Sequence, residues 1–277
     1  MADPTELDSL SSRRDARLSR RSLVAAGALM AALAPVSARA HHKEDHNNGQ
    51  TNIPGCGPSN NTPPKCQCFL RGTQLLSAGG NVAIEDLRIG DLVATESGEM
   101  RAIRWIGRIT VDREGEAPWG ADAMPVRVAK DAFGNGSPKR DLYLSRAHMV
   151  HLNGVLIPIG DLINGRTITA VDVPGAQIVY YHVELETHDV VIAEGAPCET
   201  LLTTAEKLTA FDNVDEYYAL YGAPMDMVAC APLAAFNGGR SELKSRLRSA
   251  ISPVVDIRRP MDVARDEIEA RAFSKAA

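Results

Sequence analysis

Short runs of apolar and β-branched residues alternate with turn signals from Cys68 to about Leu202. Strands that follow one another at such regular spacing favour an all-β domain over a βαβ fold. Asn153-Gly154 is the strongest turn signal, because this pair is typical of a two-residue β-hairpin. Ser97-Gly98 indicates a second hairpin. The pattern therefore predicts a mainly β, folded-over and barrel-like domain over residues 68–202.

The individual strands and helices follow from the local period. The predicted strands are Gln74 to Leu76, Val82 to Ile84, Asp91 to Thr95, Met100 to Val111, Ile178 to Glu186 and Asp189 to Ala193, with Ile168 continuing the series. Helical spacing begins beyond Thr203 and covers Ala205 to Leu208, Ser241 to Ile251 and Met261 to Phe273. Residues 203–277 are therefore expected to form a partly helical extension. Aromatic residues expected only to pack are Trp105, Tyr180 and Tyr181.

Composition and charge exclude one class of function. The 277 residues are 44% apolar, enough for one domain with extensions, and the net charge is -5. Because phosphate contacts need a surplus of clustered Lys and Arg, we expect no nucleic-acid partner. The amphipathic helices of the extension are expected to pack on the β domain or on another protomer. A role at a membrane surface is the alternative for the basic residues Arg240, Lys244, Arg246 and Arg248.

The first forty residues are typical of an export signal. The pair Arg20-Arg21 precedes a short apolar run from Leu23 to Val36, and Ala38-Arg39-Ala40 offers small residues for cleavage. We predict a cleaved twin-arginine signal peptide over residues 1–40, and hence a periplasmic or extracellular protein without an integral membrane span. Residues 41–67 are polar and predict a disordered linker. A metal site at His41, His42 and His46 with Glu44 and Asp45 is the alternative for its first part.

The cysteines and glycines point to no cofactor. Five cysteines allow up to two disulfides and leave one thiol over; they are Cys56, Cys66, Cys68, Cys198 and Cys230. Cys66-Gln67-Cys68 is too tight for a zinc knuckle, and no second ligand pair follows. Gly134-Asn135-Gly136 lacks the strand-to-helix setting of a phosphate loop.

Three blocks of the sequence contain the candidate catalytic residues. The first is Cys68 to Leu76 with Val82 to Val93. The second is Asp141 to His148, which contains Ser145, and the third is Val179 to Gly195, which contains His182 and His188. A cysteine thiol can attack the peptide carbonyl that precedes it and convert an amide into a thioester. The leaving nitrogen then needs a proton and the oxyanion needs a donor, and histidine is suited to both tasks.

These blocks, in this order, resemble the Hint domain shared by hedgehog proteins and inteins, and most of all the bacterial Hint proteins that belong to neither group. The resemblance covers Cys68 to about Leu202. It implies that Cys68 attacks the Gln67-Cys68 bond in the protein's own N-terminal segment, and that His148 protonates or polarises the scissile nitrogen. Ser145 stands where the family has threonine, keeping the hydroxyl that hydrogen-bonds the bond. The resemblance also implies an assisting proton role for His182 or His188.

The chain departs from the intein pattern at the end of the domain. Ala193-Glu194-Gly195 is followed by Ala196-Pro197-Cys198 rather than by His-Asn, so splicing is not expected. The thioester is expected to be resolved by water, a small thiol or an alcohol. Because hedgehog-type domains have a cysteine near this position, the resemblance also suggests Cys198 as a redox partner that forms a disulfide with Cys68.

Each site residue also has a plain structural reading. Cys68 alone would be a buried thiol or half of a disulfide, and His148 a core or turn histidine. His182 and His188 would be ordinary strand residues, and His151 is the natural control for His148. At the level of function, the alternative is an inactive Hint scaffold that acts as a binding or assembly module. A cysteine hydrolase that uses Cys68 and His148 in trans is the third interpretation, although no nucleophile elbow surrounds the thiol.

Overall fold

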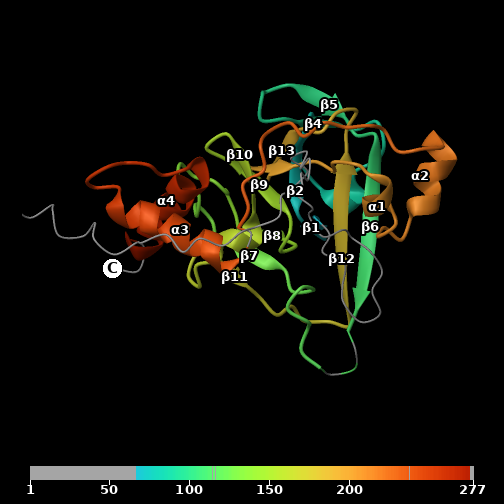
Figure 1. The fold of residues 1–277 in the computed structure, drawn as a ribbon. Coiled ribbons are helices and arrows are strands. Elements are labelled where there is room, and N and C mark those ends of the chain that lie inside the picture. Colours follow the sequence, from blue (N-terminus) through green and yellow to red (C-terminus); the bar gives the residue numbers. More distant parts are fainter. Residues whose placement is uncertain (1–66, 114, 116, 237, 275–277) are drawn as a thin grey trace, which may run out of the picture. The chain divides into compact units, whose positions relative to one another are not determined.

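A computed structural model describes residues 67–113, 115, 117–236 and 238–274. The predicted export signal, most of the predicted linker, the histidines at 41, 42 and 46, and the cysteines at 56 and 66 lie outside these residues. The described part is mainly β with a helical C-terminal part, as the sequence predicts (Figure 1). Its strands form two antiparallel sheets.

The first sheet contains the strand that follows Cys68. Its six strands are ordered β11-β7-β8-β1-β12-β6. They span β1 Phe69–Leu70, β6 Trp105–Asp112, β7 Val126–Val128, β8 Leu142–Leu144, β11 Ile168–Ala170 and β12 Gln177–Glu184. The short strand β1 therefore lies between β8 and β12, with neighbours on both sides.

The second sheet has eight strands, seven of them ordered β10-β9-β14-β13-β2-β4-β5, with β3 paired to β2. They span β2 Gln74–Ser77, β3 Gly80–Ala83, β4 Leu92–Ala94, β5 Met100–Ala102, β9 Met149–Leu152, β10 Val155–Pro158, β13 Val190–Ala193 and β14 Ala196–Glu199. Figure 1 shows this sheet beside the long β6/β12 pair.

Both predicted hairpins are present. Asn153 and Gly154 join β9 to β10 with φ of 53° and 78°. Positive φ at both central residues is the signature of a type I′ turn, which explains the Asn-Gly pair. The loop between β4 and β5 is longer and closes through the Thr95 amide on the Glu99 carbonyl, with Gly98 at φ 87°.

One predicted strand is wrong in its extent. The expected strand Met100 to Val111 divides into β5 and β6, which belong to different sheets. Ile103 is buried at the break, and the Arg104 amide donates to the Glu184 carbonyl. The apolar pattern runs through the break because the chain stays buried where it passes from one sheet to the other.

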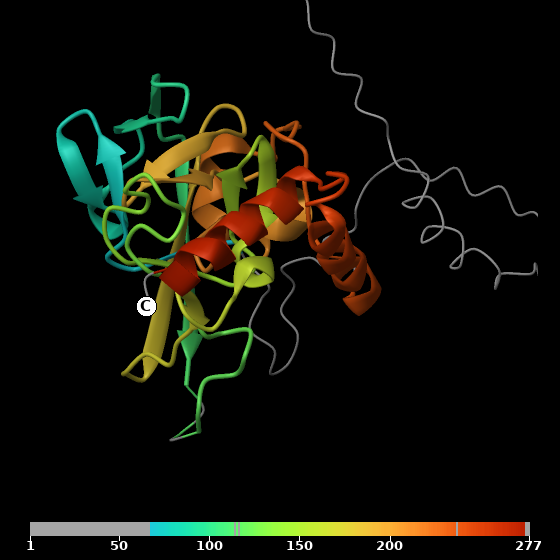
Figure 2. The same ribbon diagram turned by 90° about the vertical axis from the view of Figure 1, so that its left-hand side faces the viewer.

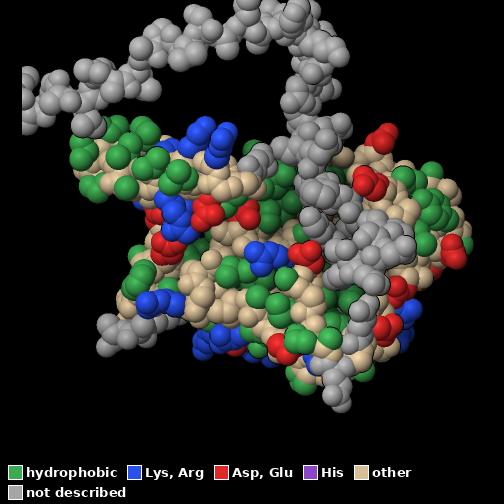
Figure 3. All heavy atoms as spheres, turned by 60° about the horizontal axis from the view of Figure 1, so that its bottom comes forward, with side chains coloured by type: hydrophobic (Ala, Val, Ile, Leu, Met, Phe, Trp, Pro, Cys, Tyr) green, Lys and Arg blue, Asp and Glu red, His purple; other side chains and the backbone are tan. Residues whose placement is uncertain are grey.

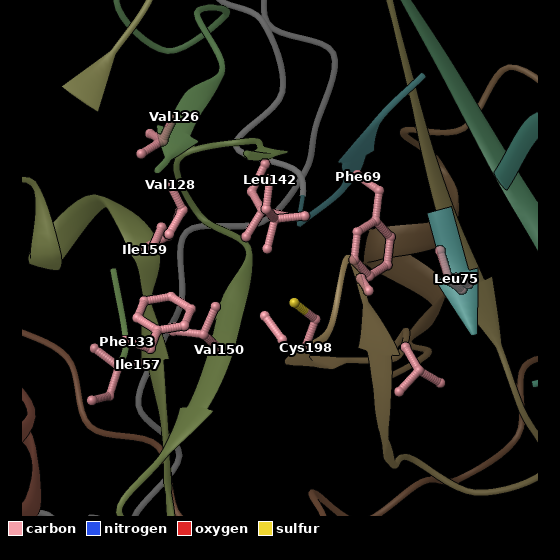
Figure 4. Packing of buried hydrophobic residues seen from close by; sticks show 14 of the residues in the cluster. Phe69, Leu75, Val126, Val128, Phe133, Leu142, Val150, Ile157, Ile159 and Cys198 are labelled. Carbon is pink, nitrogen blue, oxygen red and sulfur yellow. The ribbon is translucent and has the colours of Figure 1, made fainter. Parts of the chain in front are cut away.

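The described residues form one large and one smaller apolar core, with a minor cluster. The large core lies between the sheets and is partly shown in Figure 4. The smaller one contains Cys68, Trp105, Tyr180, Phe211 and Tyr217. Trp105 and Tyr180 are buried and Tyr181 packs against the large core. The packing roles predicted for these aromatic residues are confirmed.

The helical part contains α1 Ala205–Leu208, α2 Val214–Tyr221, α3 Gly239–Ile251 and α4 Pro260–Ser274. The three predicted helices are confirmed, and α2 was not predicted. Helix α4 packs on β9 and β10, with Met261, Ala264 and Ile268 in the large core (Figure 2). The expected packing of the extension on the β domain is therefore confirmed for α4.

The basic stretch of α3 is partly neutralised within the protein. The Arg248 guanidinium lies 2.5 Å from the buried Asp262 carboxylate of α4, and Arg246 pairs with Glu242 at 3.0 Å. Acidic and basic side chains are interspersed on the face drawn in Figure 3. In the ranges that the structure describes, we find no helix with the length and apolarity needed to cross a membrane.

Candidate functional site

The strand register places Cys68 between two polar residues. Phe69 pairs with Leu144 of β8 on one side and with Tyr181 of β12 on the other. In an antiparallel ladder, one step back on β1 is one step forward on each neighbour. Cys68 therefore faces Ser145 on one side and His182 on the other.

Two hydrogen bonds hold Cys68 against Ser145. The Cys68 amide donates to Ser145 Oγ at 2.8 Å, and the Ser145 amide donates to the Cys68 carbonyl at 2.8 Å. The first contact involves the nitrogen of the Gln67-Cys68 bond. Both residues are buried, with Cys68 0% and Ser145 6% exposed. The predicted scissile nitrogen is thus in contact with a hydroxyl in a site shielded from solvent.

The spacing between Ser145 and His148 corresponds to a β-turn. The His148 amide donates to the Ser145 carbonyl at 3.0 Å, which closes a turn after β8. The turn returns the histidine ring to the sheet, where its centroid lies 4.2 Å from that of the Phe69 ring. Neither ring nitrogen of His148 has a hydrogen-bond partner.

His148 and His182 form a buried pair of neutral rings. Both are 0% exposed, and their ring centroids are 5.0 Å apart. Burial, with the neighbouring His182, holds the pKa of His148 well below its usual range. Burial and the Lys207 charge lower the pKa of His182 to about 3, against the opposing effect of the Glu199 and Gln67 carbonyls. A neutral imidazole carries one donor and one acceptor nitrogen.

Gln67 is also held by its side chain. The Lys207 ammonium donates to Gln67 Oε1 at 2.8 Å, and Gln67 is 4% exposed. Lys207 lies on α1, so this helix contacts the residue before Cys68. Sequence analysis did not single out Lys207 for this role, because the contact joins residues 140 positions apart.

His188 lies in a separate environment next to Glu199. Its Nδ1 accepts a hydrogen bond from the Cys230 amide at 3.0 Å, and its Nε2 lies 3.4 Å from Glu199 Oε2. Burial lowers the pKa of His188, but Cys230 and Glu199 outweigh it and raise the pKa to about 9. The Glu199 carbonyl lies 3.4 Å from His182 Nε2, so Glu199 connects the two environments. Sequence analysis missed Glu199, because it is brought near His188 only by the pairing of β13 with β14.

The expected disulfide is not formed. Cys68 and Cys198 are not bonded to each other in the structure. Cys198 lies on β14 opposite Val150, and its side chain is part of the large core (Figure 4), whereas Cys68 belongs to the smaller one. Burial raises the pKa of the Cys198 thiol.

Four predicted site residues are thus brought together: Cys68, Ser145, His148 and His182. The control residue His151 is separate, with Nδ1 at 2.5 Å from Glu96 Oε2. Within the part of the chain that the structure describes, no group of three or more His, Cys, Asp or Glu side chains has the arrangement of a metal site.

Comparisons with known proteins find one family profile and several solved structures of low overall similarity. The family profile described as a Hint domain matches residues 67–205. The crystal structure of the gp41-1 intein is 12% identical, covers 48% of this chain and 98% of its own, and has a TM-score of 0.34. The bacterial intein-like domain from Clostridium thermocellum is 15% identical, covers 49% and 99%, and has a TM-score of 0.36. The MchDnaB-1 intein is 14% identical, covers 47% and 98%, and has a TM-score of 0.33. A comparison with curated protein sequences finds no match.

Proposed function

Because this chain belongs to the Hint domain family, we propose that it is a self-processing domain that cleaves its own Gln67-Cys68 bond by an N-to-S acyl shift. Cys68 is the nucleophile, and the N-terminal segment that ends at Gln67 is the substrate. The thioester is resolved by water, a small thiol or an alcohol. Splicing does not follow, because no His-Asn pair ends the domain.

The observation that carries this proposal is the contact between the Cys68 amide and Ser145 Oγ at 2.8 Å. Strand pairing of β1 with β8 alone would bring a backbone carbonyl to this amide. A hydroxyl differs from a carbonyl because it both accepts and donates a hydrogen bond. It can therefore hold the amide N–H in the ground state and supply a proton as the nitrogen becomes an amine.

The shift divides into bond changes that the site residues can assist. The Cys68 sulfur bonds to the Gln67 carbonyl carbon, the bond from that carbon to the Cys68 nitrogen breaks, and the thiol proton ends on the nitrogen. Neutral His148 and His182 can relay this proton, since each ring offers an acceptor and a donor. Burial strengthens every one of these polar contacts compared with water.

His182 is assigned to the developing oxyanion. The Gln67 carbonyl is one of the groups that favour the protonated form of the His182 ring. A donor placed at this oxygen would stabilise the negative charge of the tetrahedral intermediate, and such donors contribute about 2.7–4 kcal/mol in other acyl transfers. The Lys207 contact holds the Gln67 side chain, and in this proposal it helps to position the residue whose carbonyl is attacked.

The same proposal includes the protein's location. A twin-arginine signal over residues 1–40 would export the domain already folded, to the periplasm or the cell exterior. Cleavage before Cys68 would then release the polar segment from His41 to Gln67.

The test is intact-mass analysis of the purified full chain over time, with and without a small thiol. The variants are Cys68→Ala and His148→Ala, and His151→Ala is the matched control. We expect the segment that ends at Gln67 to be lost, faster with thiol, in the parent chain and in His151→Ala. Cys68→Ala should stay intact, and His148→Ala should be slowed by about 100-fold or more, as for loss of a general acid or base.

The opposite result favours the scaffold interpretation. A parent chain that stays uncleaved in all conditions, reducing ones included, would show that the Gln67-Cys68 bond is stable in the folded domain. The domain would then act as a binding or assembly module.

A further inference from the structure

Helix α3 turns a polar side toward the protein. The Ser245 hydroxyl donates to the Asp262 carboxylate of α4 and accepts a hydrogen bond from the Arg265 guanidinium at 2.6 Å. Arg265 also donates to the Ser249 hydroxyl at 2.9 Å, and Arg248 donates to Asp262 at 2.9 Å. Ser245 is buried at this contact, so a hydroxyl occupies the place where a surface helix usually buries an apolar side chain.

The apolar side of α3 is exposed. Leu243, Leu247 and Ile251 follow one another at intervals of four residues and therefore lie along one face of the helix. They are 59%, 57% and 46% exposed. In Figure 2, α3 projects from the rest of the domain, so this face can reach another body without a change in fold. The exposed apolar surface continues after the helix, and we call the six residues together the apolar face: Leu243, Leu247, Ile251, Val254, Val255 and Ile257.

The charge beside the apolar face is basic. With a rotation of about 100° per residue, Arg240 and Lys244 lie within about 60° of Leu247 around the helix axis. Both basic residues are exposed. The acidic residues nearby are neutralised by arginines, in the pairs Glu242–Arg246 and Asp256–Arg258. The apolar face is therefore complementary to a surface that is apolar and anionic.

We propose that α3 docks on the surface of an anionic lipid bilayer, with the apolar face among the lipid chains and Arg240 and Lys244 at the level of the phosphates. A helix that is apolar on one side and basic beside it lies in the plane of the bilayer interface in this way. Each basic side chain adds an attraction to anionic lipids, and its long stem lets the charge stay in water. A second copy of this chain would present the same basic residues, so it is the poorer match. The inference goes beyond cleavage at Cys68 and does not depend on it.

The experiment uses the full chain with Cys68→Ala, so that cleavage does not change the molecule. Val254→Trp places an indole ring in the apolar face, and Leu220→Trp places one at an exposed apolar position of α2 as the matched control. The native Trp105 and Trp119 are buried and give a constant background. The probes are vesicles of phosphatidylglycerol or of phosphatidylcholine, whose acyl chains are brominated to quench an inserted indole. With phosphatidylglycerol, the Val254→Trp chain should emit at shorter wavelength and lose emission, and the Leu220→Trp chain should do neither.

The position of the indole is the readout, rather than the total amount of bound protein. The apolar run from Leu23 to Val36 can bind vesicles by itself, and such binding would not distinguish the two indole positions. In the Val254→Trp chain, Leu247→Gln should raise the lipid concentration at half-maximal quenching about tenfold, as for one leucine side chain kept in water. Lys244→Gln should raise it about fivefold, whereas Lys244→Arg should leave it unchanged. Because these side chains are exposed, the free energy of unfolding in urea should stay the same.

Four results would overturn the inference. The first is quenching of Val254→Trp that is no greater than that of Leu220→Trp. The second is equal quenching by phosphatidylcholine, which would remove the role of charge, and the third is a Leu247→Gln titration that matches its parent. The fourth is a concentration-dependent dimer in light scattering that Leu247→Gln abolishes, because a second copy would then cover the apolar face. None of these results bears on cleavage at Cys68.

Discussion

The buried histidine pair predicts a loss of stability in mild acid. His148 and His182 have lowered pKa values, that of His182 about 3, whereas both rings titrate near their ordinary value in the unfolded chain. Below pH 6.5 the unfolded state therefore binds protons that the folded state does not. Stability must fall as the pH falls from about 6.5 toward the folded pKa values.

The magnitude follows from these values. One pH unit of such a difference corresponds to about 1.4 kcal/mol for each ring. Between pH 7 and pH 5 the His182 ring should therefore destabilise the fold by about 2 kcal/mol, and His148 adds a loss of the same sign. His188 acts with the opposite sign, because its raised pKa of about 9 gives stability that is complete below pH 6.5 and declines at higher pH. Its gain from pH 7 to pH 5 is about 1 kcal/mol, so it offsets about half of the loss at His182, and the loss at His148 adds to the remainder.

Urea unfolding at pH 7, 6 and 5 measures this loss. The measurement uses the Cys68→Ala chain, so that cleavage does not interfere. His182→Gln removes one titrating ring and should lower the loss between pH 7 and 5 by about 2 kcal/mol, whatever its effect at pH 7. His151→Gln is the control, since His151 lies outside the buried pair, and it should keep the full slope.

A free energy of unfolding that stays constant from pH 7 to 5 would refute the reasoning. So would a His182→Gln protein that keeps the whole pH dependence. Either result would mean that the rings bind protons in the folded state, and that the site is open to water.

Three further predictions concern single contacts. Ser145→Ala should slow cleavage about 5- to 100-fold, as for loss of about 1–3 kcal/mol from a buried hydrogen bond. Ser145→Thr, which keeps the hydroxyl, should cleave at the rate of the parent chain. Equal cleavage rates for Ser145→Ala and the parent chain, measured by intact mass, would contradict the role of the hydroxyl. Lys207→Met should slow cleavage about tenfold, because it removes the charged hydrogen bond to Gln67. A cleavage rate equal to that of the parent chain would show that this hydrogen bond does not contribute to the reaction. Arg104→Met should destabilise the fold by about 3 kcal/mol in urea, since it leaves Glu184 buried without its cation, while Arg101→Met, a solvent-exposed control, should cost less than about 1 kcal/mol.

The sequence predicted those parts of the fold that depend on residues close together in the chain. The hairpin at Asn153-Gly154 needs two residues that tolerate positive φ, and an Asn-Gly pair in the sequence is the usual choice for such a turn. Helix α4 carries its buried residues Met261, Ala264 and Ile268 at helical spacing. Ser145 and His148 were identified together from the resemblance to the Thr-x-x-His pattern of the Hint family, and in the structure the His148 amide and the Ser145 carbonyl close a turn.

The parts that sequence did not predict depend on distant partners. Strand β1 has two residues, too few for a period, and it exists because β8 and β12 pair with it. Helix α2 is anchored through Tyr217, which receives a hydrogen bond from Arg104 at 2.9 Å and packs its ring on Trp105. The roles of Lys207 and Glu199 likewise appear only when elements far apart in the chain meet.

The family resemblance grouped residues that lie together in the structure, but it did not predict the state of the cysteines correctly. It assigned Cys68, Ser145 and His148 to one site. It also suggested a Cys68–Cys198 disulfide that the structure does not form. The alternation of β14 explains why: Cys198 points into the large core, and the next residue, Glu199, reaches His188.

The long separations within the site also determine when the proposed reaction can occur. Ser145 meets Cys68 from 77 positions along the chain, and Lys207 meets Gln67 from 140 positions. Contacts between residues so far apart in the sequence form late in folding, after most of the domain is in place. In a nascent or unfolded chain, the Gln67-Cys68 linkage is an ordinary peptide bond with no neighbours to break it. In this proposal, a cleaved molecule is therefore one that has folded at least once. Because the peptide bond does not re-form, loss of the N-terminal segment identifies that molecule even after it unfolds.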